Sequence, residues 1–98
     1  MSEVKRFSDL KTYADDVSQW VKIDDVLNKD IIITDCVFAK GQFGEYMIVK
    51  FTDLNSEEIR AFTTGGIVLI DKIKYAKENN LLPLVGKIIK EKRYYDIV

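Results

Sequence analysis

Residues 38–64 constrain the fold most, because they contain two runs of alternating side chains joined by a turn-forming segment at 52–56. In the run 45–52 one alternate set is mixed and the other is apolar: Tyr46, Ile48 and Lys50 against Met47, Val49 and Phe51. The run 57–63 alternates as Glu58, Arg60 and Phe62 against Ile59, Ala61 and Thr63. Side chains along a strand point alternately to opposite faces. The segment therefore predicts a hairpin with an apolar inner face and an outer face of aromatic and cationic residues.

Three further strands are expected around this hairpin. The β-branched run 30–40 predicts a long strand, in which Thr34 and Asp35 mark a bend or bulge that lets the strand serve two sheets. Residues 40–44 contain two glycines and predict a flexible loop. Residues 84–90 and 94–98 predict the last two strands, joined by a tight basic turn at 91–93. Tyr94 and Tyr95 alternate, so one of them faces outward.

A helix is predicted between residue 67 and Asn79-Asn80. Its apolar stripe consists of Ile67, Ile70, Ile73 and Ala76, with Leu69 beside it. A second helix is predicted at residues 8–21, with Ser8 as N-cap and Trp20 anchoring the helix on the sheet. The competing interpretation of its end is a strand through 17–23. Residues 24–29 predict one helical turn or a tight loop.

This order of elements predicts a mainly β fold: a five-stranded oligonucleotide-binding (OB) barrel with an N-terminal helical extension. Ninety-eight residues make one domain, in which 1–28 form the extension and 29–98 the barrel. The lone Cys36 and the lack of an apolar run of about 20 residues favour a reducing, intracellular setting without a membrane span.

The residue types argue against an enzyme. The chain has no histidine and one cysteine, so the usual zinc sites and Ser-His or Cys-His pairs cannot be built from it. The acidic doublets 15–16, 24–25 and 57–58 do not converge, because neighbouring side chains point in different directions. We therefore expect no catalysis, no metal and no cofactor.

The charge of the chain is unevenly distributed, although its net value is −1. Residues 1–35 hold five Lys/Arg against eight Asp/Glu, whereas residues 65–98 hold seven against four. Phosphate binding depends on the local field, so a basic groove remains compatible with this total. Outward aromatic residues beside cations suit stacking on bases and contact with phosphates. The candidate nucleic-acid-binding residues are Lys40, Phe43, Tyr46, Lys50, Arg60, Phe62, Lys87, Lys90, Lys92 and Arg93.

Four segments, 20–27, 31–35, 44–51 and 62–66, resemble small single-stranded-DNA-binding proteins of bacteriophages and related mobile elements. The resemblance covers residues 18–98. It implies an OB barrel in the bacterial cytoplasm that coats single-stranded DNA, without catalysis, during phage replication or recombination. It also implies that Tyr46, Lys50, Arg60 and Phe62 contact the DNA strand. The partners of such a protein would be single-stranded DNA and replication or recombination proteins. Apart from the resemblance, an exposed first or fifth strand leaves pairing between subunits open, so a homo-oligomer such as a dimer is a further candidate.

A barrel does not by itself fix a function. The alternative is a protein-interaction module on the same barrel, such as a phage inhibitor of a host protein or an assembly subunit. The face around Tyr46, Ile48 and Phe62 would then be a hydrophobic contact patch with the cations as its rim.

Overall fold

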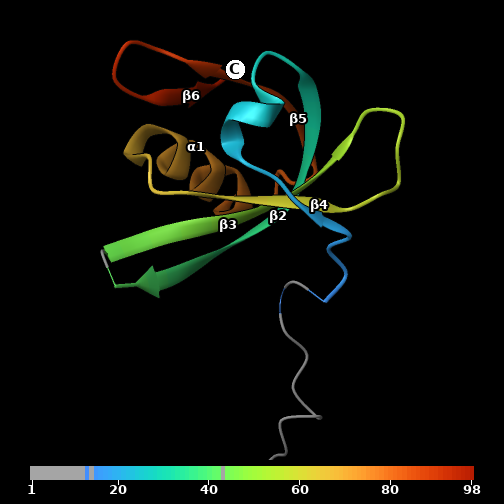
Figure 1. Cartoon of the computed structure of the whole chain (residues 1–98), viewed down its shortest axis with the longest axis horizontal. Helices are drawn as coiled ribbons and strands as arrows, with labels where there is room; N and C mark the ends of the chain where they lie inside the picture. The colour runs from blue at the N-terminus through green and yellow to red at the C-terminus, as the bar shows by residue number, and fades with distance from the viewer. Residues whose placement is uncertain (1–12, 14, 43) are drawn as a thin grey trace, which may run out of the picture.

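The computed structural model describes residues 13, 15–42 and 44–98, and within them the chain is mainly β (Figure 1). One α-helix and one short 3-10 helix accompany a single six-stranded sheet. The elements in chain order are β1 (Gln19–Trp20), η2 (Ile23–Val26), β2 (Asp30–Gly41), β3 (Gly44–Asp53), β4 (Arg60–Thr64), α1 (Ile67–Glu78), β5 (Leu84–Lys90) and β6 (Tyr95–Ile97). The described helices include none that is long and apolar enough to cross a membrane.

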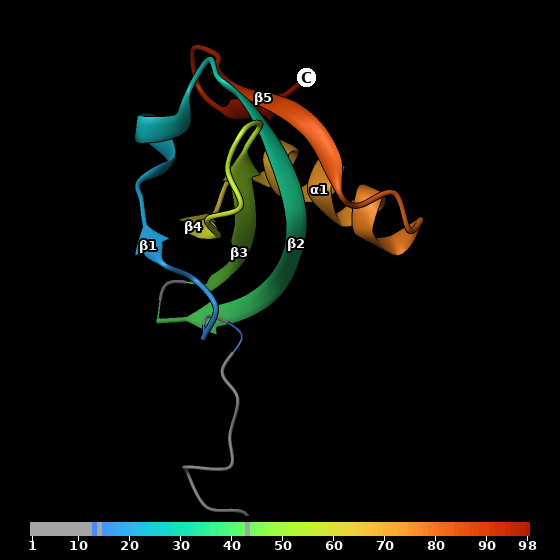
Figure 2. The ribbon, with the colours of Figure 1, turned by 90° about the vertical axis from the view of Figure 1, so that its right-hand side faces the viewer.

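The long strand β2 is the centre of the sheet. Neighbouring strands follow the order β1-β4-β3-β2-β5-β6. β2 pairs with β3 along most of its length and with β5 between Asp30 and Ile33. Its register with β3 shifts between Ile33 and Asp35, which confirms the predicted irregularity. The strand curves strongly around the molecule (Figure 2), as expected where a bulge adds local twist.

The sheet buries one face, and cross-strand register decides which residues occupy it. On β3, Met47, Val49 and Phe51 are fully buried, as predicted. On β4, Phe62 lies opposite Val49 and is also fully buried, with its ring centre 5.7 Å from that of Phe51. The prediction of an outward-facing Phe62 is therefore wrong. Ala61 lies opposite Lys50 and Thr63 opposite Ile48. Ala61 is nevertheless fully buried, as predicted, whereas Thr63 is exposed on the outer face.

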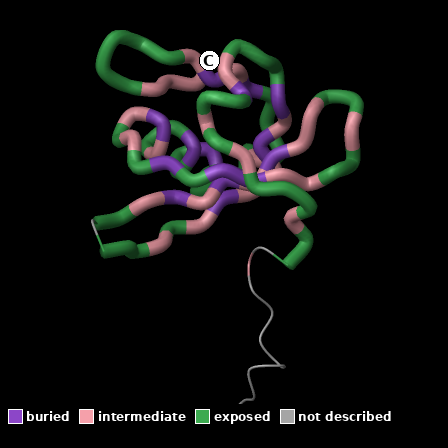
Figure 3. The backbone as a smooth tube through the Cα atoms, viewed as in Figure 1, coloured by how far each residue is buried: buried purple, intermediate pink, exposed green. Residues whose placement is uncertain are grey.

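The helix α1 covers part of the buried face, and the core lies between them (Figure 3). Leu69, Ile73 and Ala76 are the buried residues of the helix, whereas Ile67, predicted to join them, is 76% exposed. The chain leaves the helix through Asn79 as C-cap and Asn80 with positive φ, as the paired asparagines predicted. The helix thus begins at an exposed residue beside the end of β4.

The described part of the predicted N-terminal helix is not helical. Residues 8–12 and 14 lie outside the described residues, and Gln19–Trp20 forms strand β1, parallel to β4. Hydrogen bonds from Ser18 N to Ile59 O (2.8 Å) and from Val21 N to Ala61 O (2.9 Å) extend this pairing. Trp20 is half exposed, so it does not anchor a helix on the sheet. The competing interpretation of a strand within 17–23 fits the structure.

The sheet is open, because its edge strands β1 and β6 do not pair with each other in the described chain. η2 lies between the two edges. Tyr95 of β6 donates a 2.6 Å hydrogen bond to Asp24 of η2, and Asn28 N donates to Ile88 O at 2.8 Å. The segment between β1 and β2 therefore bridges an opening that strand pairing leaves.

Candidate functional site

The outer face of β3 does not present free cations. Lys50 Nζ lies 2.7 Å from the carboxylate of Asp16 and 3.9 Å from the ring centre of Tyr13. Its side chain is only 11% exposed. The contact with Asp16 lowers the pKa of that carboxyl, since a hydrogen bond from a cation favours the charged form. Lys50 is therefore already occupied within the chain.

Arg60 is also engaged. Its guanidinium lies 2.5 Å from the carboxylate of Asp53 and 5.1 Å from the ring centre of Phe51. Register places Arg60 opposite Phe51, on the face that continues into the core rather than on the outer face. Arg60 thus closes the end of the buried face, and the mixed outer face predicted for β3 and β4 is only partly formed.

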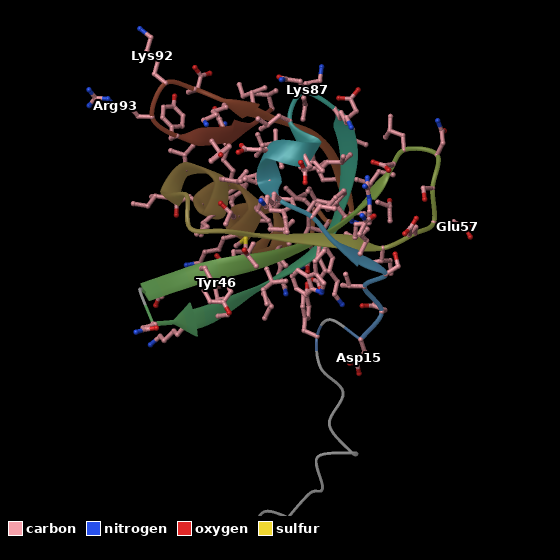
Figure 4. The ribbon with its side chains drawn as sticks, viewed as in Figure 1. Asp15, Tyr46, Glu57, Lys87, Lys92 and Arg93 are labelled. Carbon is pink, nitrogen blue, oxygen red and sulfur yellow. The ribbon has the colours of Figure 1, made fainter. Side chains whose placement is uncertain are left out.

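The structure does not bring the predicted residues of β2, β3 and β5 together into one site. Tyr46 is half-buried, and its ring packs over Gly41, where an added Cβ would lie 3.2 Å from the ring. Lys40 is exposed near the end of β2, and Phe43 lies outside the described residues. Lys87 on β5 faces Asp30 at 4.0 Å. Figure 4 shows Tyr46 and Lys87 far from each other on the molecule.

The remaining predicted cations gather at the β5–β6 hairpin. Lys90, Lys92 and Arg93 are exposed, and Figure 4 shows Lys92 and Arg93 projecting from the hairpin. Within the described part of the chain, none of these three cations forms an ion pair with a carboxylate. Tyr94 is 46% exposed, whereas Tyr95 turns inward to Asp24. Tyr94 is therefore the outward tyrosine of the pair.

These residues line a hollow of about 670 Å³ between the hairpin and the end of β4. Its walls come from η2, from the junction of β4 with α1, and from the hairpin; the lining consists of Ile23, Thr63, Thr64, Gly65, Gly66, Ile67, Val68, Lys90, Lys92, Arg93, Tyr94 and Tyr95. The lining contains three cations, two tyrosines and no carboxylate. We call it the hairpin hollow.

Two further hollows continue from the hairpin hollow along α1. The next, of about 240 Å³, shares Gly65 and Ile67 with it and reaches Phe38 and Lys74. A third, of about 520 Å³, shares Phe38 and Lys74 with the second and ends at Lys77. We call the three together the strand groove. Exposed apolar surface recurs along it, at Tyr94, Ile67 and Phe38.

Charge in the strand groove is graded. The second and third hollows include Glu45, Asp71 and Glu78, and their cations are partly paired. Lys74 Nζ lies 3.8 Å from Glu78 and 5.4 Å from the ring centre of Phe38. Lys77 donates to the carbonyl of Cys36 and lies 3.0 Å from Asp35. The hairpin hollow is therefore the part of the groove best suited to hold an anion.

The sequence did not indicate that Phe38, Ile67 and Lys74 line the strand groove. Phe38 belongs to the inward alternation of β2, but the arm formed by β2 and β3 extends beyond the core, so its ring is 44% exposed beside α1. The exposed start of α1 carries Ile67 into two of the hollows. Apolar periodicity in the sequence does not reveal that Phe38 and Ile67 are exposed, because it does not show where the core ends. Among the described residues, no three Cys, Asp or Glu side chains are grouped so as to hold a metal ion.

A family model described as "Domain of unknown function (DUF8468)" matches residues 17–98. The match runs from just before β1 to the last residue and includes the strand groove. No curated protein and no solved structure matches the chain.

Proposed function

The chain belongs to this family of domains of unknown function, and we propose that it binds single-stranded DNA, without catalysis, along the strand groove. The observation that carries the proposal is the lining of the hairpin hollow: three cations, two tyrosines and no carboxylate. Phosphates of a single strand require cations, and its unpaired bases require apolar or aromatic surfaces on which to stack.

The fold supports this proposal. We infer that the sheet is an opened OB barrel. The order of three strands, a helix and two strands, with β2 pairing to both β3 and β5, fits that architecture. OB barrels are often incompletely closed, and the loop between their last two strands takes part in oligonucleotide binding. In this chain the corresponding loop carries Lys92 and Arg93.

The groove suggests how a strand lies. Its phosphates would contact Lys90, Lys92 and Arg93, and its bases would stack on Tyr94 and then on Phe38. Each stacked base is worth about 1–3 kcal/mol and is read with little regard to sequence. The mode is therefore sequence-independent. A place in phage replication or recombination rests solely on the resemblance of residues 18–98 to phage proteins.

A fluorescence titration tests the proposal. Oligo-dT should change the emission of the tyrosines and of the single Trp20, whereas duplex DNA should not. Three phosphate contacts predict a slope of about −2 in a plot of log affinity against log salt concentration. A parallel titration with oligo-rA tests whether the protein also binds single-stranded RNA. Failure to bind oligo-dT at low salt would refute the proposal.

The second candidate is a protein-interaction module, and an apolar surface at the start of β5 favours it. Leu84 and Val85 are about half exposed and line a hollow of about 180 Å³, and the half-exposed Leu81 precedes them in the chain. We propose a second copy of the chain as its occupant. Sedimentation velocity should then show a dimer that Val85→Lys abolishes, and a monomer at high concentration would exclude this candidate.

A further inference from the structure

Lys50 occupies an unusual position for a lysine on the outer face of a sheet. Register places it opposite Asp35 of β2, on the face away from the core. Solvent would ordinarily surround such an ammonium group, yet the side chain is almost enclosed. The enclosing groups are the carboxylate of Asp16, at 2.7 Å, and the ring of Tyr13, whose centre is 3.9 Å away. Residues Tyr13 and Asp16 of the chain's own N-terminal segment therefore cover Lys50 on this face.

The way in which the cover is attached changes along the chain. From Ser18 onward, backbone hydrogen bonds to β4 hold it, at Ile59 and Ala61. At Asp16 and Tyr13 the contacts with the sheet come from side chains instead. The carboxylate of Asp16 is also more than half exposed to water. The part of the cover that lies on Lys50 can thus detach without breaking the β1–β4 pairing.

Tyr13 fits its place imperfectly. Its hydroxyl is buried near the carboxylate of Asp35 and makes no hydrogen bond of good geometry to any described residue. Burial raises the pKa of this phenol, with smaller contributions from the charge of Asp35 and from Asp35 as a nearby hydrogen-bond acceptor, so the group stays neutral. A buried hydroxyl without a well-formed hydrogen bond costs free energy relative to its hydrated state. The closed arrangement therefore satisfies this hydroxyl less well than water does, even with Asp35 nearby.

We propose that the outer face of β3 is a second binding surface for single-stranded DNA, held closed by Tyr13 and Asp16. Asp16 occupies the place of a phosphate on Lys50, and the Tyr13 ring occupies the place of a base. Tyr46 and Ile48 continue the same face along β3, toward the end of the arm. When a DNA strand binds, a phosphate replaces the carboxylate of Asp16 at Lys50, and a base replaces the ring of Tyr13. The ligand class rests on the function proposed for the strand groove.

Two full-chain variants with opposite effects test the cover. Asp16→Asn removes the ion pair at nearly constant shape, and we expect about three- to fivefold tighter binding of oligo-dT. Tyr13→Phe removes the poorly satisfied hydroxyl, strengthens the cover and should weaken binding. Glu57→Gln is the charge-matched control, since it removes one carboxylate from the β3–β4 loop, which Figure 4 shows apart from Asp15, the chain neighbour of Asp16. It should leave the affinity within twofold of wild type.

A double variant assigns the gain to Lys50. In Asp16→Asn/Lys50→Gln, the affinity should equal that of Lys50→Gln alone, because the uncovered ammonium is missing. Thermal unfolding of each variant shows that it is folded. If wild type binds oligo-dT but Asp16→Asn binds no better than Glu57→Gln, the cover is purely structural and this inference is overturned. If wild type does not bind, the proposed function itself fails.

Discussion

The hydroxyl of Tyr95 on β6 donates a 2.6 Å hydrogen bond to the carboxylate of Asp24 in η2, and this contact joins segments 71 residues apart across the opening of the sheet. The hydrogen bond to Asp24 raises the pKa of Tyr95, because it stabilises the protonated phenol. A phenol whose pKa is raised by folding contributes stability below its unfolded pKa of about 10, and this stability is lost as pH rises beyond it.

Asp24→Asn should therefore shift the ionisation of one tyrosine to lower pH. Absorbance titration of the phenols measures this directly, and Tyr95→Phe should remove the same late step. Tyr13, whose phenol is also shifted upward, should titrate late in both variants. The unfolding temperature of wild type should fall more steeply above about pH 10 than that of Tyr95→Phe. An unchanged titration in Asp24→Asn would mean that the bond is not formed in solution.

Gly86→Ala should destabilise the protein by about 1–3 kcal/mol, the usual effect of overpacking. A Cβ at this position would lie 2.6 Å from Ile97 Cδ1, between β5 and β6. Urea denaturation gives the change in the free energy of unfolding. Gly65→Ala is the matched control, since a Cβ there meets nothing within 4 Å and should change stability little. Adding Ile97→Val to Gly86→Ala removes the closest atom and should restore part of the loss.

Phe62→Ala and Tyr94→Ala should separate stability from binding. Phe62 is fully buried, so its truncation should cost about 3–5 kcal/mol of unfolding free energy. Tyr94→Ala should leave unfolding nearly unchanged and weaken oligo-dT binding by about 1–3 kcal/mol at every salt concentration. Tyr75→Ala is the control, because that exposed tyrosine on α1 does not line the strand groove. Equal binding by Tyr94→Ala and wild type would exclude stacking in the hairpin hollow.

Lys92→Ala and Arg93→Ala should each flatten the salt dependence of binding, by roughly one unit of slope or slightly less. Each removes a cation that faces no carboxylate of the described chain. Lys87→Ala should leave the slope unchanged, since Lys87 faces Asp30 and lies outside the groove. The slopes come from titrations between about 50 and 200 mM salt. The reverse ranking would place the phosphate path along β5 instead.

Local patterns predicted the position of most elements. Strands β2, β3 and β5 and the helix α1 occupy nearly their predicted ranges, because each run is long enough for its own period to be recognised. The prediction that Phe62 lies on the outer face of β4 was wrong for a different reason. Both alternate sets of 57–63 mix apolar and polar side chains, so hydrophobicity does not choose between them. The pairing of Phe62 with Val49 makes that choice, and it depends on register between strands.

The N-terminal segment shows the same limit. The spacing of Tyr13 and Val17 is compatible with a helix, yet Gln19–Trp20 pairs with a strand some 40 residues later. The location of the candidate site also differs from the prediction. The sequence predicted the basic hairpin, because a charged turn is exposed whatever its neighbours are. It did not predict that Asp16 pairs with Lys50 or that Asp53 pairs with Arg60, since these contacts depend on the tertiary fold.

The two-residue strand β1 also bears on the order of folding. Hairpin β3–β4 pairs residues as close as Phe51 and Arg60, whereas β1 reaches β4 across 41 residues, from Gln19 to Arg60. Closing the longer loop costs more chain entropy, so β1 should join the sheet after the hairpin has formed. During that interval the backbone of β4 is an uncovered edge, which is where aggregation begins in β proteins. The yield of refolded protein should therefore depend on concentration until Gln19 and Trp20 are in place.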